Sequence, residues 1–188
     1  MDQATTIPRR DVELLLIGLD DGGVNGITRL QKLLFLLQKE EGLERDGANF
    51  AFRAYKAGPY SPEIYDDLEF LENLGLLDSE ITAEATPAEA AEIDVMSFEN
   101  MMGENTSSEE MSPDAYSERQ FRLTLKGKGR VEALLSRDEY KPVVEKIRRV
   151  KSRFGRYSLN DLLYYVYTKY PEMATESEIK DKVLGRRR

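Results

Sequence analysis

The side chains best suited to catalysis are missing from this sequence. Its 188 residues include no histidine and no cysteine, so an imidazole base, a thiolate nucleophile and the usual zinc sites are excluded. Carboxylates, lysines, tyrosines and serines remain. The run Gly18–Gly23 lacks the Lys-Ser/Thr ending and the preceding strand of a phosphate-binding loop. We therefore predict a protein that is not an enzyme and that uses no cofactor and no metal.

Negative charge is concentrated in one part of the chain. Residues 78–118 contain twelve acids and no Lys or Arg. Since the whole chain carries −8, everything outside this stretch carries +4. Low hydrophobicity with high net charge is typical of disorder, because burial of apolar surface cannot offset the loss of chain entropy. We predict an acidic flexible insertion over residues 85–117.

Apolar runs are short throughout the sequence. Leu14–Ile17 and Leu33–Leu37 are the longest, far below the roughly 20 residues that a membrane span needs. The start Met1–Gln3 has no basic residue followed by an apolar stretch, so no secretory signal is expected. These features predict no membrane association and a cytoplasmic location.

Hydrophobic periodicity predicts a mainly α (α+β) fold. Helices are expected over 11–19, 25–40 and 61–74, with an extended segment at 50–55. The 25–40 helix is expected to be buried on most sides, with Arg29, Lys32 and Lys39 reaching outward. Strands near 78–83 and 119–124 and a helix to 137, entered through a turn at 125–129, complete a winged-helix-like core over 1–84 and 118–137, in which the insertion is a long wing.

Residues 138–188 are predicted to add C-terminal helices to this core. Val143, Ile147, Val150 and Phe154 recur at steps of four, three and four, which indicates a narrow packing seam. Ser158, with an Asp three residues later, resembles a capping box for the next helix. That helix is tyrosine-rich, and a last short helix follows it.

Several segments taken together resemble a known family. They are Ile27–Leu37 with its Lys-Leu-Leu-Phe-Leu-Leu core, Phe52–Ser61 with its Gly-Pro-Tyr-Ser turn, and Tyr65–Leu77 ending in Gly-Leu-Leu. The chain resembles prokaryotic proteins of the YwgA type and the SocA-like, or Panacea, antitoxin domains over roughly residues 10 to 80. This resemblance implies a winged-helix-like fold, no catalysis, and a role as an antitoxin, proteolytic adaptor or regulatory partner.

The third helix of a winged helix ordinarily enters the DNA major groove. Here the 61–74 helix carries five acids and no Lys or Arg, and carboxylates oppose binding to phosphate. Two interpretations remain: a solvated face over a core stripe, or an acidic face that meets a basic partner protein. For the second, the candidate partner-binding residues are Tyr60, Glu63, Asp66, Asp67 and Glu69.

Cations gather in a different place. The seven basic residues of 141–156 include four at steps of three, four and three, which predicts a basic face opposite the packing seam. With two lysines at the base of the wing, they form a candidate site for nucleic acid or an acidic partner: Lys126, Lys128, Lys146, Arg149, Arg153 and Arg156. A charged, solvated helix face is the simpler interpretation.

Two functions follow from these patterns. The first is a non-enzymatic regulatory protein-interaction module, of antitoxin or adaptor type, whose partner is a toxin or a second copy in a homodimer. The alternative is a DNA-binding transcriptional regulator that uses the basic C-terminal helix. The tyrosines of 157–170 fit either function, as a protein interface or as a stacking surface for bases, and fit core packing better.

Overall fold

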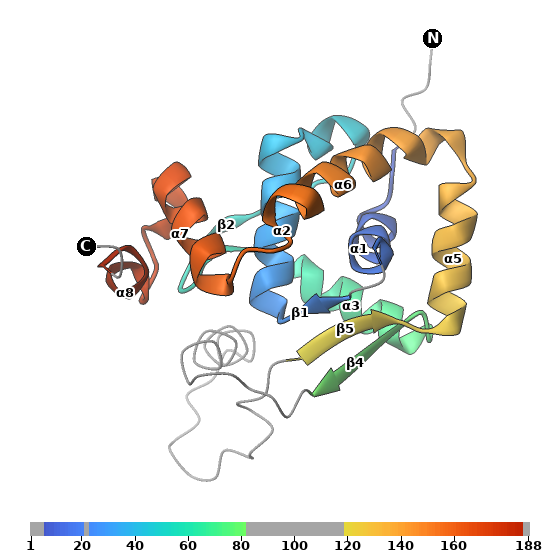
Figure 1. Ribbon diagram of the computed structural model, residues 1–188, viewed down its shortest axis with the longest axis horizontal. Coiled ribbons are helices and arrows are strands. Elements are labelled where there is room, and N and C mark those ends of the chain that lie inside the picture. Colours follow the sequence, from blue (N-terminus) through green and yellow to red (C-terminus); the bar gives the residue numbers. More distant parts are fainter. Residues whose placement is uncertain (1–5, 21–22, 82–118, 186–188) are drawn as a thin grey trace.

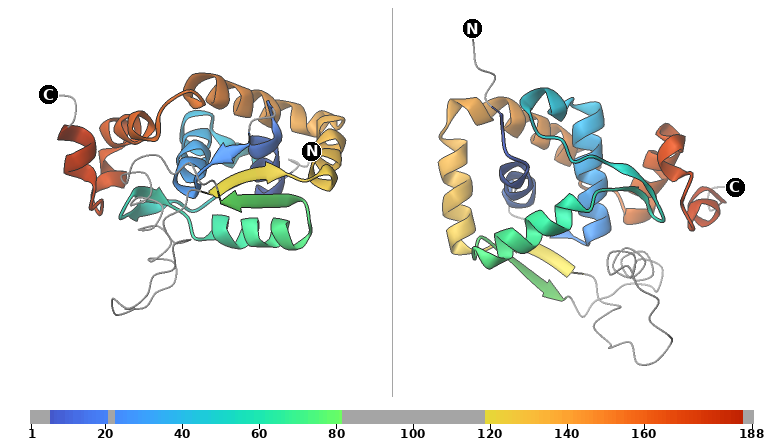
Figure 2. Two further views of the ribbon diagram at one scale, coloured as in Figure 1. Left: turned by 60° about the horizontal axis from the view of Figure 1, so that its bottom comes forward. Right: turned by 180° about the vertical axis from the view of Figure 1, so that it is seen from behind.

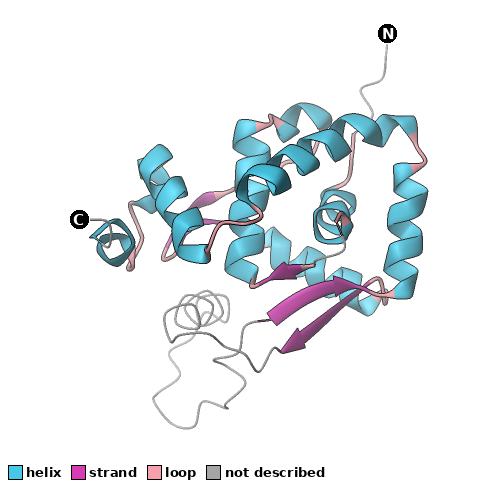
Figure 3. Ribbon diagram, in the orientation of Figure 1, coloured by secondary structure: helices cyan, strands magenta, loops and turns pink. Residues whose placement is uncertain are grey.

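The computed structural model describes residues 6–20, 23–81 and 119–185, and the predicted insertion 85–117 lies outside them. Within the described residues the fold is α+β and mainly helical, as predicted (Figures 1 and 3). The helices are α1 (Arg9–Gly18), α2 (Ile27–Glu40), α3 (Glu63–Asn73), α5 (Leu125–Leu135), α6 (Lys141–Phe154), α7 (Leu159–Lys169) and α8 (Lys180–Gly185).

Helix α1 lies at the centre of the molecule. In Figure 1 it is seen end-on, inside a frame made by α2, α6, α5, α3 and the strands. All seven residues from Asp11 to Ile17 are buried, because the neighbouring elements cover the helix on every side. Hydrophobic periodicity predicted a helix over 11–19, and the structure places it at Arg9–Gly18.

Helix α2 is buried on most sides, as predicted, from Leu30 to Gln38. Two of its three cations do not reach outward. Lys32 is only 2% exposed, and the guanidinium of Arg29 donates to the carbonyl of Tyr157 at 2.8 Å. The outward prediction was wrong for these two because carbonyl groups of later segments lie within their reach.

Three antiparallel strands form the main sheet, in the order β1 (Val24–Asn25), β5 (Arg119–Leu123) and β4 (Leu77–Ile81). Leu77 pairs with Leu123 and Ile81 with Arg119, so the strand pair expected on either side of the insertion is present. Figure 2 shows α3 on one side of this sheet and α6 on the far side of the molecule. The order helix, strand, two helices and two paired strands is the basis of the winged-helix interpretation, which stays a prediction.

The connection between α2 and α3 is longer than the short turn of a helix-turn-helix. It contains the 3-10 helix η1 (Leu43–Asp46) and a hairpin of β2 (Arg53–Tyr55) and β3 (Gly58–Tyr60). Gly58 has φ +91°, and a Cβ there would lie 2.7 Å from the ring of Tyr167. Only glycine fits this position, because it both adopts the positive φ and leaves room for the tyrosine.

The C-terminal helices share the core of the rest of the chain. The predicted seam of α6 is buried along its length, and α7 adds Leu162, Leu163 and Val166 to the same hydrophobic cluster. Ser158 caps α7, accepting a hydrogen bond from the amide of Asp161 at 3.1 Å. Residues 125–129, expected as a turn, belong to α5, whose N-cap is Thr124. Among the described residues, none of the helices has the length and hydrophobicity that a transmembrane span requires.

Candidate protein-interaction surface

The Gly-Pro-Tyr-Ser turn is held by two polar side chains of α2. Lys32 donates from Nζ to the carbonyl of Pro59 at 3.0 Å, and the side-chain oxygen of Gln31 accepts from the amide of Ser61 at 2.9 Å. Both α2 residues are 2% exposed. In the described residues β3 pairs only with β2. The two side chains of α2 therefore supply hydrogen bonds that a second neighbouring strand would otherwise provide. Two of the three segments on which the predicted resemblance depends, Ile27–Leu37 and Phe52–Ser61, are therefore in direct contact.

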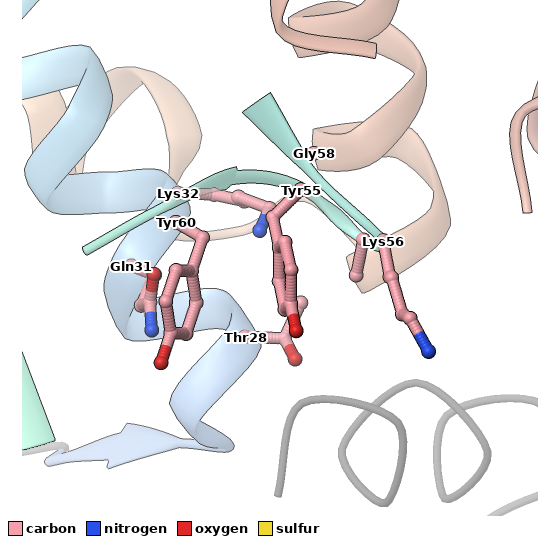
Figure 4. Close-up of a pocket in the computed structure, with 8 residues that line it drawn as sticks. Thr28, Gln31, Lys32, Tyr55, Lys56, Gly58 and Tyr60 are labelled. Carbon is pink, nitrogen blue, oxygen red and sulfur yellow. The ribbon is translucent and has the colours of Figure 1, made fainter. Parts of the chain in front are cut away.

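A small pit opens beside this turn. It is lined by two tyrosines, two lysines and four other residues: Thr28, Gln31, Lys32, Tyr55, Lys56, Ala57, Gly58 and Tyr60. Figure 4 shows the hydroxyls of Tyr55 and Tyr60 pointing the same way as the Gln31 amide. The volume of this open pit is about 10 Å³, close to the space of one water molecule.

A row of tyrosines leads from the pit to α3. The rings of Tyr55 and Tyr60 are 4.8 Å apart, and those of Tyr60 and Tyr65 are 6.0 Å apart. Tyr60 is 7% exposed, and burial, followed by the neighbouring Tyr55, raises its pKa. The phenol therefore stays protonated at neutral pH and is available as a donor.

The acids of α3 differ sharply in exposure. Asp66 and Glu69 face solvent, and Glu63 is half-buried and accepts a hydrogen bond from the Ser61 hydroxyl at 2.8 Å. Asp67 is 1% exposed and pairs with Arg9 at 2.9 Å and Arg10 at 2.7 Å.

The expectation that Asp67 belongs to a surface face is therefore wrong. The start of α1 supplies two guanidinium groups that a view of α3 alone cannot reveal. The exposed acids of the predicted set are Asp66 and Glu69.

Apolar side chains accompany these acids. Among the described residues the large hydrophobic side chains with high exposure are Phe70 (41%), Leu74 (43%), Leu125 (89%) and Leu135 (37%). Phe70 of α3 and Leu74, the residue that caps its C-terminus, are one turn apart. Leu125 follows Thr124, whose hydroxyl donates to the carbonyl of Gly75 at 2.7 Å, so it lies beside the end of α3. We call Asp66, Glu69, Phe70, Leu74 and Leu125 the α3 face.

The two lysines at the predicted wing base lie in α5, next to the α3 face. Lys126 donates from Nζ to the carbonyl of Leu74 at 2.7 Å, which caps the C-terminus of α3. Lys128, in the first turn of α5, is exposed. Of the two, Lys126 has a structural partner, the carbonyl of Leu74.

Most of the predicted basic face of α6 is paired with acids of the same chain. Arg149 contacts Glu41 at 2.7 Å, Arg153 contacts Glu40 at 2.8 Å, and Lys146 pairs with Asp46. These cations flank the packing seam and reach the end of α2 and η1; they do not point away from the core. Arg156 is exposed and borders a separate open groove of about 670 Å³ over α7. The acids from the end of α2 to η1, which include Glu40, Glu41 and Asp46, are the signal in the sequence that could have indicated this pairing.

Glu40 is the centre of a network that the sequence did not indicate. Its carboxylate is 9% exposed and accepts hydrogen bonds from Tyr165 at 2.7 Å, Lys169 at 2.9 Å and Arg153 at 2.8 Å. Burial disfavours the charged carboxylate, but the bonds from Lys169 and Tyr165 and the nearby positive charges outweigh it, and the pKa of Glu40 is lowered. This network joins α2, α6 and α7 and accounts for Tyr165 as a structural residue.

In the described part of the chain, no three Asp or Glu side chains are grouped as a metal site requires. Comparisons with models of protein families, with curated proteins and with solved structures found no match to this chain.

Proposed function

We propose that this chain is a non-enzymatic regulatory protein-interaction module, of antitoxin or adaptor type, on a winged-helix-like scaffold, and that it binds its partner through the α3 face. The observation that carries the proposal is the grouping of Phe70, Leu74 and Leu125 beside Asp66 and Glu69. Exposed apolar patches rimmed by charge are typical of protein interfaces.

The charge of the face favours a basic protein partner. Asp66 and Glu69 have no ion-pair partner in the described residues, so Lys or Arg side chains of a partner would meet them without displacing a native contact. Duplex DNA is disfavoured here because the same carboxylates repel phosphate. The predicted nucleic-acid site on α6 is disfavoured as well, since three of its cations are neutralised within the chain.

A different protein fits the α3 face better than a second copy of this chain. In a two-fold symmetric dimer the same patch meets itself. Asp66 and Glu69 of one protomer would then face the same acids of the other, and like charges in contact are unfavourable. A toxin-like or adaptor-bound protein that presents apolar residues flanked by Lys or Arg avoids this conflict.

Affinity capture from native cells tests the proposal with two matched variants of the full chain. Leu74→Arg places a charge on the α3 face, and Leu135→Arg places one at a site of similar exposure (43% and 37%) outside it. We expect one stoichiometric protein to bind the wild-type chain and Leu135→Arg and to be lost with Leu74→Arg. Equal capture by all three chains, a homodimer that Leu74→Arg disrupts in light scattering, or salt-sensitive DNA binding by all three in a mobility-shift titration would each overturn the proposal.

A further inference from the structure

The main sheet ends at β4, which has five residues and, in the part of the chain that the structure describes, a neighbouring strand on one side only. Figure 1 shows β4 as the outermost strand of this sheet, with β5 on its inner side. The opposite edge is β1, which has two residues, and the hairpin strands β2 and β3 have three each. Among the described residues, β4 therefore has the longest strand edge without a partner.

The register shows which backbone groups of β4 point to this edge. The amide of Thr124 donates to the carbonyl of Leu76 at 3.2 Å, so this pair is a position at which the two strands are hydrogen-bonded. Such positions alternate along an antiparallel ladder. Asp78 and Glu80 therefore direct their N–H and C=O groups to β5, and Ser79 between them directs its own groups outward.

A hydrogen bond on the far side of β5 agrees with this alternation. Arg119 stands opposite Ile81 in the register, and its carbonyl accepts from the amide of Gly26, next to β1, at 2.8 Å. The odd-numbered residues of β5 thus face β1, and the even-numbered ones face β4. Apart from the ladder itself, no hydrogen bond within the described residues engages the backbone of Ser79.

The side chains along this edge carry surplus negative charge. Asp78 and Glu80 are both exposed, and they lie on the same face of the strand because they are two residues apart. Arg122 stands opposite Asp78 in the register, but its guanidinium pairs with Glu80, at 3.4 Å. Asp78 has no ion-pair partner in the described residues, so it is open to a cation from outside.

We propose that a protein partner adds an extended segment, with Lys or Arg at alternate positions, to the free edge of β4. The N–H and C=O groups of Ser79 bond to the backbone of that segment, and its cations stand opposite Asp78 and Glu80. Addition of a strand to a sheet edge is a recurring mode of peptide recognition. Leu74 of the α3 face is three residues before Leu77, so the edge continues the proposed surface. The identity of the partner rests on the proposed function, whereas the free edge rests on the register alone.

Charge distinguishes this occupant from two others. If two copies of the chain paired antiparallel about Ser79, Asp78 of each copy would stand opposite Glu80 of the other, and like charges at opposed positions are destabilising. Residues 82–118 contain acids and no Lys or Arg, so they would meet the same repulsion. A basic segment meets attraction at both positions.

A titration with a short blocked peptide tests the edge in the full chain. The probe is acetyl-Val-Lys-Thr-Lys-Val-amide, whose lysines stand opposite the two acids when its Thr is opposite Ser79. The readout is the ¹H–¹⁵N amide signal of Ser79 at pH 7. In the free chain we expect this amide to exchange with solvent faster than the amides of Asp78 and Glu80. With the probe we expect a saturable shift, and none with acetyl-Val-Glu-Thr-Glu-Val-amide.

Two singly N-methylated probes provide the matched control for the backbone. Methylation of the Thr nitrogen removes the N–H that faces β4 and should weaken binding at least about fivefold, the effect of one net hydrogen bond. Methylation of a Lys nitrogen removes an N–H that faces solvent and should leave binding unchanged. Equal binding of the two methylated probes would overturn the proposal, as would a Ser79 amide that exchanges as slowly as that of Glu80 in the free chain.

Two variants of the chain with the same change in net charge test the acids. Asp78→Lys should weaken binding of the basic probe at least about threefold, while Glu132→Lys, at an exposed position of α5, should leave it unchanged. Equal binding by both, with an intact fold in their amide spectra, would contradict the role of Asp78. Since no partner is used, this result is independent of the capture experiment. If the probe binds and capture fails, the strand site stands without the proposed partner; if capture succeeds and the probe fails, the α3 face stands without the strand site.

Discussion

The Nε of Arg10 lies 2.7 Å from a carboxylate oxygen of Asp67, so the first turn of α1 fixes the middle of α3. The same guanidinium lies 3.8 Å from the centroid of the Phe70 ring. One side chain thus connects the buried core helix to the α3 face, and the orientation of that face depends on this contact.

Replacing Asp67 should therefore destabilise the fold. Asp67→Asn removes the charge that two arginines share at a side chain only 2% exposed. Because both arginines are partly solvated, we expect a loss of about 2 kcal/mol in the free energy of unfolding. Asp66→Asn, at the exposed neighbour, should change it by less than about 0.5 kcal/mol. Urea titration of both variants measures this, and equal effects would contradict the buried role of Asp67.

A second carboxyl near this contact should make stability fall as pH rises. Glu13 is fully buried, and neither of its oxygens has a hydrogen-bond partner in the described residues. Burial, with a contribution from the charge of Asp67, raises the pKa of Glu13 well above its ordinary value of 4.5, while Arg9 and Arg10 oppose this rise.

The direction of the effect follows from proton binding. Between pH 4.5 and the raised pKa, the folded chain holds a proton on Glu13 that the unfolded chain has lost, so stability decreases with pH across that interval and stays lower above it. Glu13→Gln should abolish this decrease and be more stable than the wild-type chain above the interval. Thermal melts of the two proteins at a series of pH values provide the measurement; parallel curves would show that Glu13 is not the titrating group.

Glu40 should give the opposite dependence. Its lowered pKa means that it contributes stability above the unfolded value of 4.5 and loses it as pH falls through the folded pKa. At pH 7 we expect Glu40→Gln to lower the free energy of unfolding by about 1 kcal/mol. The loss is small because Arg153 and Lys169 are about half exposed, and solvent screens their charges. The difference from wild type should shrink on acidification below pH 4.5. A difference that stays constant with pH would show that the charge of Glu40 is unimportant.

Two glycines with positive φ offer a test of packing against backbone strain. At Gly58 an added Cβ meets the Tyr167 ring at 2.7 Å, whereas at Gly75 it meets open space. Gly75→Ala should lower the free energy of unfolding by about 1 kcal/mol, the penalty for placing a side chain at positive φ. Gly58→Ala adds a steric clash in a buried site and should lower the free energy of unfolding by at least about 2 kcal/mol more than Gly75→Ala does. Chemical unfolding of the pair decides this, and similar losses would mean that the hairpin shifts to make room.

Hydrophobic periodicity within single segments predicted the helices and the two strands of the β4–β5 pair. Each of these elements shows its own periodicity, which can be read without knowledge of the tertiary contacts. The α6 seam and the Ser158 cap are such features, and both are present. Lys32, Asp67 and the α6 cations were placed on the surface, since charged residues in a helix usually face water. Each is partnered by a segment distant in sequence: the carbonyl of Pro59, the arginines of α1, and the acids after α2.

The candidate surface was predicted only in part for the same reason. Asp66 and Glu69 could be identified from helix periodicity as exposed acids. Leu125 could not be assigned to their side of the molecule, because its position depends on contacts between Thr124 and Gly75, far apart in the sequence. The pit likewise requires α2, β2 and β3 together, and no one segment shows it.

The pairing of Ile81 with Arg119 bears on the length of the connection between β4 and β5. Since these residues stand opposite each other at the end of a two-stranded ladder, a hairpin turn of two residues is enough to join them. The core therefore imposes no length on the polypeptide between them. A turn of two residues in place of residues 82–118 is therefore compatible with the same pairing of β4 and β5.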